Sequence, residues 1–297
     1  MEILTNQLWG HESKANYQAY LMGNSKDIEL ERKHPAVIIC GGGGFARITA
    51  REQEPVALYF LNQGYQAIVL NYTTHSIGDG TFPNPVLDLA KMMLIVRENA
   101  AKWQIDPEKV TIMGFSAGGT VCASLATQWQ EPFLAEKLGV SAERLRPNAV
   151  VLGYPILDFV YQKEMAAVDK NRDEILKLVN QPKGLFLDKA LELGAGKGAT
   201  IAQLESVSPI SHVTSNVPPV FIWGTADDEM MYTTQLLNFA RKLSENNLNY
   251  ELHIFESGPH GQSLANYNST PSGSEDGISI WAPLALMFLK KHLQYMN

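Results

Sequence analysis

A serine, two adjacent aspartates and a histidine are spaced along this 297-residue sequence as the parts of a hydrolytic triad would be. Ser116 stands in the pentapeptide Gly-Phe-Ser-Ala-Gly at 114–118, between an apolar run at 109–113 and a run of small residues at 119–126. A serine at a sharp strand-to-helix turn is a nucleophile elbow, in which the glycines remove side chains that would collide. We therefore predict that Ser116 is a nucleophile and that the amide of Ala117 points to where an oxyanion would form.

A serine hydroxyl becomes a good nucleophile only when a base takes its proton, and the base needs a third group to orient it. Among the seven histidines, His260 lies in a loop with glycine and proline between the last predicted strand and the last predicted helix. A loop at that place can bring an imidazole to Ser116, so we predict that His260 is the base. The orienting acid should follow the preceding strand, at 220–223. There we predict Asp227, with Asp228 as the alternative.

The second part of the predicted oxyanion hole is a run of four glycines at 41–44, directly after an apolar run at 36–40. Successive glycines let backbone amides turn toward an anionic oxygen, so we expect the amides of Gly43 and Gly44 to join that of Ala117. The spacing of a dinucleotide-binding loop is missing here. The bulky ring of Phe45 is expected to close one side of the acyl pocket, and His75, which follows the strand at 66–72, to contact substrate.

Strand-like and helix-like segments alternate along most of the chain, which predicts an α/β fold with a mainly parallel, doubly wound sheet. The segment 156–212 breaks this alternation and is too long for a simple crossover. We interpret it as a helical cap insertion, with helices near 160–181 and 185–193, over a core formed by 1–155 and 213–297. Segments 15–22 and 27–31 are expected to form an antiparallel edge pair. Core strands are predicted at 36–40, 66–72, 109–113, 149–153, 220–223 and 250–255, and core helices at 85–102, 231–245 and 279–295.

Composition is that of a globular protein, with 45% hydrophobic and 19% charged residues and a net charge of −7. The sequence has no basic run, which argues against nucleic-acid and anionic-membrane partners. Two cysteines, Cys40 and Cys122, cannot form a disulfide framework, and no zinc-site spacing is present, so no metal or cofactor is expected. No signal-peptide pattern or membrane-length apolar stretch is found, so a cytoplasmic location is expected. The expected partner is a small-molecule ester, and a homodimer is left open.

Six segments together carry a more specific signal than any single motif. They are IICGGGGF (38–45), REQEPVALYFLNQGYQAIVLNY (51–72), IVRENAAKWQIDPEKVTIMGFSAGG (95–119), RPNAVVLGYP (146–155), PPVFIWGTADDE (218–229) and ELHIFESGPHG (251–261). With them the chain resembles the bacterial acetyl-esterase and xylan-esterase-like branch of the α/β-hydrolase superfamily, near the hormone-sensitive-lipase-type esterases. The resemblance implies an α/β-hydrolase fold with Ser116 as nucleophile, Asp227 as acid and His260 as base.

Two positions depart from the pattern of that family. Gly41 stands where the family often has histidine or proline before its three glycines, which would loosen the oxyanion hole. Met230 and Met231 follow the acidic segment where the family commonly has Val-Pro, which bears on the choice between Asp227 and Asp228.

The function these residues favour is that of a serine carboxylesterase that acts on short acyl esters, with acetylated sugars as candidate substrates. A small cap should leave a small acyl pocket, so acetyl and propionyl esters are expected to be preferred over octanoyl esters. Two alternatives stay open. One is a peptidase of the prolyl-oligopeptidase kind, which the segment 225–228 and the late His-Gly pair also resemble. The other is a non-catalytic ligand-binding hydrolase homologue, against which the intact serine, aspartate and histidine argue.

Overall fold

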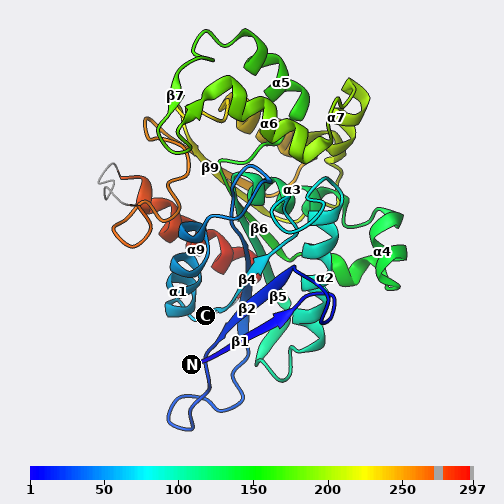
Figure 1. The fold of residues 1–297 in the computed structure, drawn as a ribbon. Helices are drawn as coiled ribbons and strands as arrows, with labels where there is room; N and C mark the ends of the chain where they lie inside the picture. Colours follow the sequence, from blue (N-terminus) through cyan, green and yellow to red (C-terminus); the bar gives the residue numbers. More distant parts are fainter. Residues whose placement is uncertain (271–276, 295–297) are drawn as a thin grey trace.

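The computed structural model describes residues 1–270 and 277–294 and centres on an eight-stranded sheet (Figure 1). The strand order is β1-β2-β4-β3-β5-β6-β9-β10. Strands β1 and β2 run antiparallel to their neighbours, and all other neighbours pair in parallel. The predicted mainly parallel α/β sheet is therefore confirmed. The strands are β1 (Glu2–Gln7), β2 (Asn16–Leu21), β3 (His34–Cys40), β4 (Gln66–Asn71), β5 (Ile105–Phe115), β6 (Ala149–Gly153), β9 (Val220–Thr225) and β10 (Tyr250–Phe255).

Helices cover both faces of this sheet, which explains why its central strands are apolar runs without alternation. Strand β3, for example, is buried at every position. Helices α1 (Glu54–Asn62) and α9 (Trp281–Leu293) pack on one face, and their apolar side chains form one core cluster with it (Figure 1). The other face is covered by α2 (Asn84–Glu98), α3 (Ala117–Gln128) and α8 (Thr234–Glu245), with α4 (Pro132–Leu138) at its margin.

The antiparallel edge of the sheet differs from the sequence-based prediction. Strand β2 pairs with β1 and β4, whereas residues 27–31, which were expected to be its partner, lie in turns. The hairpin between β1 and β2 is closed by the amide of Leu8, which donates to the carbonyl of Ala15. Strand β1 is exposed at nearly every position, so it needs no apolar alternation and gives no strand signal in the sequence.

The segment 156–212, which we call the cap segment, lies over the carboxyl ends of the central strands (Figure 1). The predicted helix at 160–181 is wrong in its second half. Helix α5 ends at Val168, and a short hairpin of β7 and β8 follows. The division into a core (1–155 and 213–297) and an inserted cap domain stays a prediction. The elements of the cap segment are α5 (Phe159–Val168), β7 (Ile175–Leu176), β8 (Gln181–Pro182), α6 (Lys183–Ala195), α7 (Ile201–Val207) and the 3-10 turn Pro209–His212.

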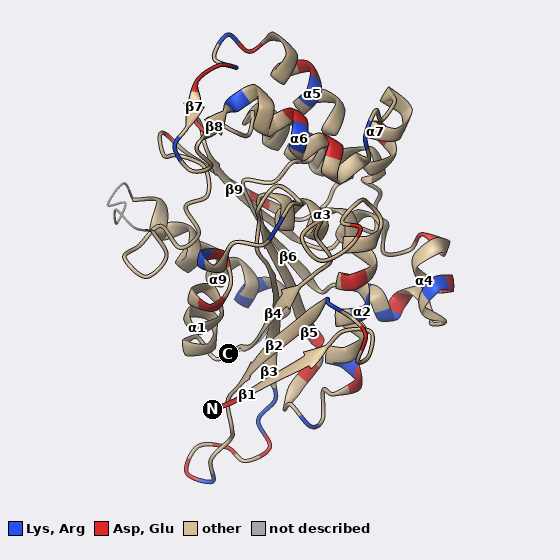
Figure 2. Ribbon diagram, viewed as in Figure 1, with Lys and Arg blue, Asp and Glu red and all other residues tan. Residues whose placement is uncertain are grey.

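Charged residues of both signs are interspersed over the outer helices and loops, and few lie on the central strands (Figure 2). In the part of the chain that the structure describes, no helix is both long and apolar enough to cross a membrane.

Candidate active site

Ser116 stands at the turn between β5 and α3, with backbone angles φ +50° and ψ −124° that a residue with a side chain rarely adopts. Its amide donates to the carbonyl of Gly153 on the neighbouring strand, at 2.9 Å, which helps hold the strained turn. Gly118 is required here, because a Cβ atom on it would lie 2.1 Å from the carbonyl oxygen of Cys40. The structure thus has the elbow geometry that the pentapeptide predicts.

His260 lies between Ser116 and an aspartate, with one ring nitrogen facing each. Its Nε2 is 2.9 Å from Oγ of Ser116, and its Nδ1 is 2.8 Å from Oδ2 of Asp228. The side chains of His260 and Asp228 are each 4% exposed, so bulk water hardly competes for these bonds. A buried carboxylate that holds Nδ1–H leaves Nε2 free to accept the serine proton, which is the arrangement of an acyl-transfer triad.

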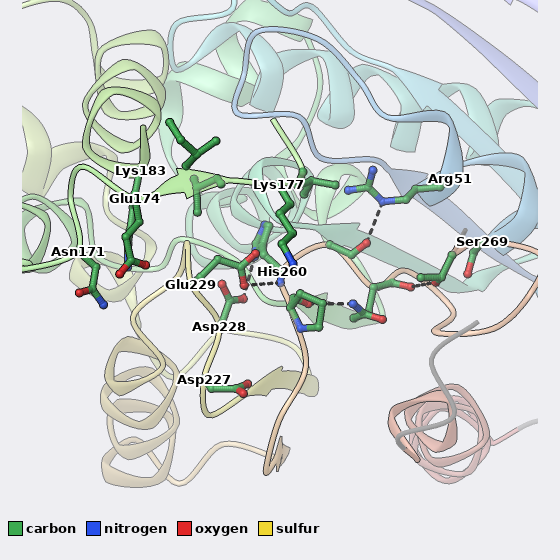
Figure 3. Close-up of a pocket in the computed structure, with 17 residues that line it drawn as sticks. Arg51, Asn171, Glu174, Lys177, Lys183, Asp227, Asp228, Glu229, His260 and Ser269 are labelled. Carbon is green, nitrogen blue, oxygen red and sulfur yellow. Dashed lines mark hydrogen bonds and ion pairs between the residues drawn. The ribbon is translucent and has the colours of Figure 1, made fainter. Parts of the chain in front are cut away.

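The prediction that Asp227 orients His260 is corrected by this geometry, and the neighbouring Asp228 takes its place. Asp227 is exposed, and its Oδ1 accepts a hydrogen bond from the amide of Gly258 at 2.7 Å. In Figure 3 Asp228, and not Asp227, is the aspartate beside His260. The amides of Met230 and Met231 both donate to Oδ1 of Asp228, at 2.8 Å each, and so fix the carboxylate that faces the imidazole.

The charge around His260 favours its protonated form. Burial of the imidazole lowers its pKa, but the carboxylates of Asp228, Glu52 and Glu229 outweigh burial, and the pKa of His260 is raised above its ordinary value. Asp228 contributes both by its charge and by its hydrogen bond, while Glu229 also accepts a bond from the amide of His260 at 3.0 Å. An imidazolium formed when the serine gives up its proton is therefore stabilised in this site.

Two backbone segments can supply donors to an oxyanion beside Ser116. Ala117 is the first residue of α3, where an amide has no partner within the helix and the helix dipole is positive. Gly43 and Gly44 line the same cavity as Ser116 and His260. The structure thus brings the three predicted oxyanion-hole residues to the nucleophile, and their role stays a prediction.

Two cavities meet at His260. The first, which we call the serine cavity, has a volume of about 360 Å³ and is lined by Ser116, the glycine loop and the hairpin of the cap segment. The second, which we call the cap-side cavity, has a volume of about 860 Å³ (Figure 3). Arg51, Leu178 and His260 line both. Figure 3 shows the cap-side cavity between core residues Asp228, Glu229 and His260 and cap residues Asn171, Glu174, Lys177 and Lys183.

Two predicted substrate contacts lie elsewhere. Phe45 is fully buried and packs against the rings of Phe82 and Phe159, so its side chain belongs to the core. The aromatic ring that lines the serine cavity is that of Phe186. His75 is exposed, and its Nε2 lies 2.9 Å from the carbonyl of Leu193 in α6. Among the described residues that line the two cavities, neither Phe45 nor His75 is found.

The sequence-based prediction missed Glu52 and Arg51, which follow the glycine loop. Glu52 is 1% exposed and lines the serine cavity. Arg51 donates through Nε to the carbonyl of Gly261, at 2.8 Å, and so contacts the histidine loop. The sequence does carry an Arg-Glu pair after the glycines. Charged residues are usually exposed, so such a pair is typical of an exposed helix start and does not by itself predict a buried site residue. Among the described residues, no group of three or more histidine, cysteine or acidic side chains could hold a metal ion.

The model of the family described as BD-FAE matches residues 26–243, which is more than half of the chain. The chain belongs to the BD-FAE family. It is 30% identical to endo-1,4-beta-xylanase B of Butyrivibrio fibrisolvens over 79% of this chain and 33% of that protein. It is 28% identical to acetylxylan esterase of Xylanibacter ruminicola over 82% of this chain and 48% of that protein. The chain thus spans between a third and a half of the length of these curated relatives.

A solved structure agrees with the fold. The carboxylesterase Cest-2923 from Lactobacillus plantarum superposes with a TM-score of 0.79 over all of both chains, at 24% identity. At that identity the likeness shows the fold alone. Together with the family match and the acetylxylan esterase relative, this fold confirms the predicted resemblance to the esterase branch of the α/β hydrolases.

Proposed function

We propose that this protein is a serine carboxylesterase that hydrolyses short-chain acyl esters of polar alcohols through an acyl-enzyme, with acetylated sugars as the substrate class. Ser116 is the nucleophile, His260 the general base, and Asp228 the acid that orients it. The observation that carries the proposal is the continuous hydrogen-bonded series from Asp228 through His260 to Ser116, at 2.8 and 2.9 Å, in a buried site that opens into two cavities.

The chemistry follows from this arrangement. Oγ of Ser116 attacks the ester carbonyl carbon while its proton passes to Nε2 of His260. The carbonyl oxygen becomes an oxyanion, to which the amides of Ala117, Gly43 and Gly44 donate. The intermediate collapses, the imidazolium gives its proton to the departing alcohol oxygen, and the acyl group stays on Ser116. Water, activated by His260 in the same way, then releases the carboxylic acid and restores the serine.

The two cavities suggest where the acyl and alcohol parts of the ester bind. The carbonyl must lie between Ser116 and the glycine loop, so the acyl chain belongs in the serine cavity. The departing alcohol oxygen must lie beside Ser116, where Nε2 of His260 can protonate it, and the rest of the alcohol can extend past His260 into the cap-side cavity. Because the two cavities share His260, Arg51 and Leu178, a single ester can extend into both.

The size of the serine cavity supports a short acyl group. At about 360 Å³ it must hold the reacting carbonyl as well as the chain, and Phe186, Val179 and Met230 are among its lining. A Cβ atom on Gly44 would lie 3.3 Å from Cζ of Phe186, so this ring packs close against the glycine loop. A methylene that finds no room cannot contribute the ~0.8 kcal/mol that burial would give.

The lining of the cap-side cavity supports a polar alcohol. Amide, hydroxyl and charged side chains from the core and the cap can bond sugar hydroxyls, and the apolar side chains of the β7–β8 hairpin can contact the C–H faces of a sugar ring. The polar lining residues include Asn171, Glu174, Lys177, Gln262, Ser269 and Thr270, and the apolar ones Ile175, Leu176 and Leu178.

The test is a comparison of kcat/KM across p-nitrophenyl esters from acetyl to decanoyl, acetylated xylo-oligosaccharides and an aminoacyl p-nitroanilide. We expect acetyl and propionyl esters to exceed octanoyl, deacetylation of the oligosaccharides, and no amide cleavage. Rates that rise up to octanoyl or beyond would indicate a lipase. Faster anilide cleavage would favour the peptidase. A chain that hydrolyses none of these would favour the ligand-binding alternative.

A further inference from the structure

Glu52 is a buried carboxylate that the triad chemistry leaves unused. It ends the 3-10 turn Ala50–Glu52 and is 1% exposed. Its Oε2 accepts hydrogen bonds from the amide of Gly42 at 2.7 Å and from Oγ1 of Thr49 at 2.5 Å, and its Oε1 accepts one from the hydroxyl of Tyr154 at 2.9 Å. Burying a carboxylate costs several kcal/mol of stability. If this position had only a packing role, a neutral side chain would destabilise the fold less.

Through its Oε2 atom, Glu52 holds the part of the glycine loop that packs against Ser116. A Cβ atom on Gly42 would lie 2.7 Å from Cβ of Ser116 and 3.0 Å from Oε2 of Glu52, so the serine and the carboxylate both pack close against Gly42. The carbonyl of Gly42 is also fixed, by the amide of Thr49 at 2.9 Å. With both polar groups of the Gly42 backbone held, the orientation of the following amides, Gly43 and Gly44, is constrained.

Through its Oε1 atom, Glu52 reaches the histidine loop by way of Tyr154. The hydroxyl of Tyr154 donates to Glu52 and accepts from the amide of Ser263 at 2.8 Å. Its ring packs edge-on against the imidazole of His260, with ring centres 4.8 Å apart. Burial and the charge of Glu52 hold the pKa of Tyr154 well above its usual range, so the hydroxyl stays protonated and can donate.

We propose that Glu52 is a positioning residue that couples the oxyanion-hole loop to the general base, and that its negative charge supports the imidazolium of His260. This inference rests on the proposed esterase function. One carboxylate bonds the glycine loop directly and the histidine loop through Tyr154, so the distance between the two donors and the base is fixed by a single buried group.

The charge of Glu52 acts on His260 together with the other groups that face the imidazole. The carboxylates of Asp228 and Glu229 come from the loop after β9, and all three acids raise the pKa of His260. The guanidinium of Arg51 lies in the same turn as Glu52, with Nη2 3.9 Å from its Oε1. The ring of Tyr154 packs against the imidazole of His260. Lys177 lines the cap-side cavity together with His260.

The test uses the full chain with three variants, Glu52→Gln, Glu52→Asp and, as matched control, Glu98→Gln, whose carboxylate is exposed on α2. Glutamine can keep an oxygen toward Gly42 and Thr49 but carries no charge. We expect Glu52→Gln to lower kcat on p-nitrophenyl acetate about ten-fold with little change in KM. In the pH profile of kcat/KM, the fall at low pH, which we call the acid limb, reports protonation of His260. In Glu52→Gln it should move to lower pH by roughly half a unit or more.

Glu52→Asp keeps the charge but withdraws it by one methylene. We expect it to lower kcat about ten-fold while the acid limb stays within about 0.2 unit of the wild-type position. If Glu52→Gln fails to fold, the kcat of Glu52→Asp tests the proposal on its own. In both variants kcat is measured per active site by titration with a fluorophosphonate. Glu98→Gln should match the wild type in kcat, KM and acid limb.

Four outcomes would overturn the proposal. If folded Glu52→Gln loses thermal stability alone, with kcat and acid limb unchanged, Glu52 is structural and the proposed function still stands. If its acid limb does not move, the charge has no role in the base. If Glu52→Asp shows wild-type kcat, the position of the carboxylate does not matter. A wild type that hydrolyses no ester would overturn both this inference and the proposed function.

Discussion

On the sheet side of the site, Ser116, His260 and Asp228 are held by hydrogen bonds from the backbone or from each other, and the side chains of His260 and Asp228 are almost fully buried. On the cap side, Glu174 and Lys177 face the same space from an exposed hairpin. Bond-making groups must be fixed to a fraction of an ångström, whereas groups that select a substrate can adapt to it. Under the proposed function, we therefore expect the strand ends to carry the chemistry and the cap segment to select the alcohol.

Among the variants that test this comparison, the one with the largest expected effect lies on the sheet side and distinguishes two neighbouring acids. Asp228→Asn should lower kcat for p-nitrophenyl acetate by about 10³- to 10⁴-fold, because an amide no longer selects the tautomer in which Nε2 of His260 accepts a proton. Asp227→Asn should cost less than about ten-fold, since asparagine can still accept from the amide of Gly258. Each variant controls for the other. Equal losses, or a larger loss at Asp227, would refute the assignment of the acid.

The next effect tests one of the contacts that hold the cap segment to the core. Asp169 accepts bonds through Oδ2 from Nζ of Lys183 and from the hydroxyl of Tyr232, at 2.7 Å each, and only Tyr232 comes from outside the cap segment. Tyr232→Phe removes that link. We expect KM for acetylated xylo-oligosaccharides to rise about three- to ten-fold, with kcat nearly unchanged.

The control for this variant is Tyr267→Phe, because Tyr267 is 90% exposed. It should leave both constants at the wild-type values. If Tyr232→Phe instead lowered kcat and left KM unchanged, the cap segment would take part in the chemistry, and the separation of the two sides would be wrong.

The smallest effect concerns pH. Because His260 must be neutral to act as base and its pKa is raised, kcat/KM should fall as pH drops through a value above the ordinary histidine pKa. Glu229→Gln removes one carboxylate that raises this pKa, while its side-chain oxygen can still accept from the amide of His260. The acid limb should therefore move to lower pH, by less than in Glu52→Gln. A limb that moves to higher pH in the Glu229 variant would contradict the electrostatic account.

The strand ends were predictable because buried parallel strands are continuous apolar runs that end in glycine or in polar residues. The runs at 36–40 and 109–113 lie within β3 and β5, and the elbow and glycine loop follow them directly. The acid was missed by one residue, because the turn after β9 decides which aspartate faces inward. There the amide of Ala226 donates to the carbonyl of Phe255, and Asp227 is exposed, which no local pattern shows.

The cap segment was less predictable because its bends depend on tertiary partners. The predicted helix at 160–181 ends early, since Asp169 accepts a bond from the amide of Asn171 and is then fixed by Lys183 and Tyr232. Both partners are distant in sequence from the point where the helix ends. Phe45 was assigned to the pocket because its place after the glycines is local information, whereas its burial against Phe82 and Phe159 is not.

The central claim is that Ser116 is the nucleophile of a triad with His260 and Asp228. The most direct measurement is intact-mass and peptide mapping after reaction with a fluorophosphonate, made on the wild type and on Ser116→Ala alongside p-nitrophenyl acetate hydrolysis. We expect one adduct per chain, on the peptide that contains Ser116. In a folded Ser116→Ala protein we expect no adduct, and a loss of kcat of several orders of magnitude, up to about 10⁶-fold. An adduct on another residue, or substantial esterase activity in Ser116→Ala, would contradict the account.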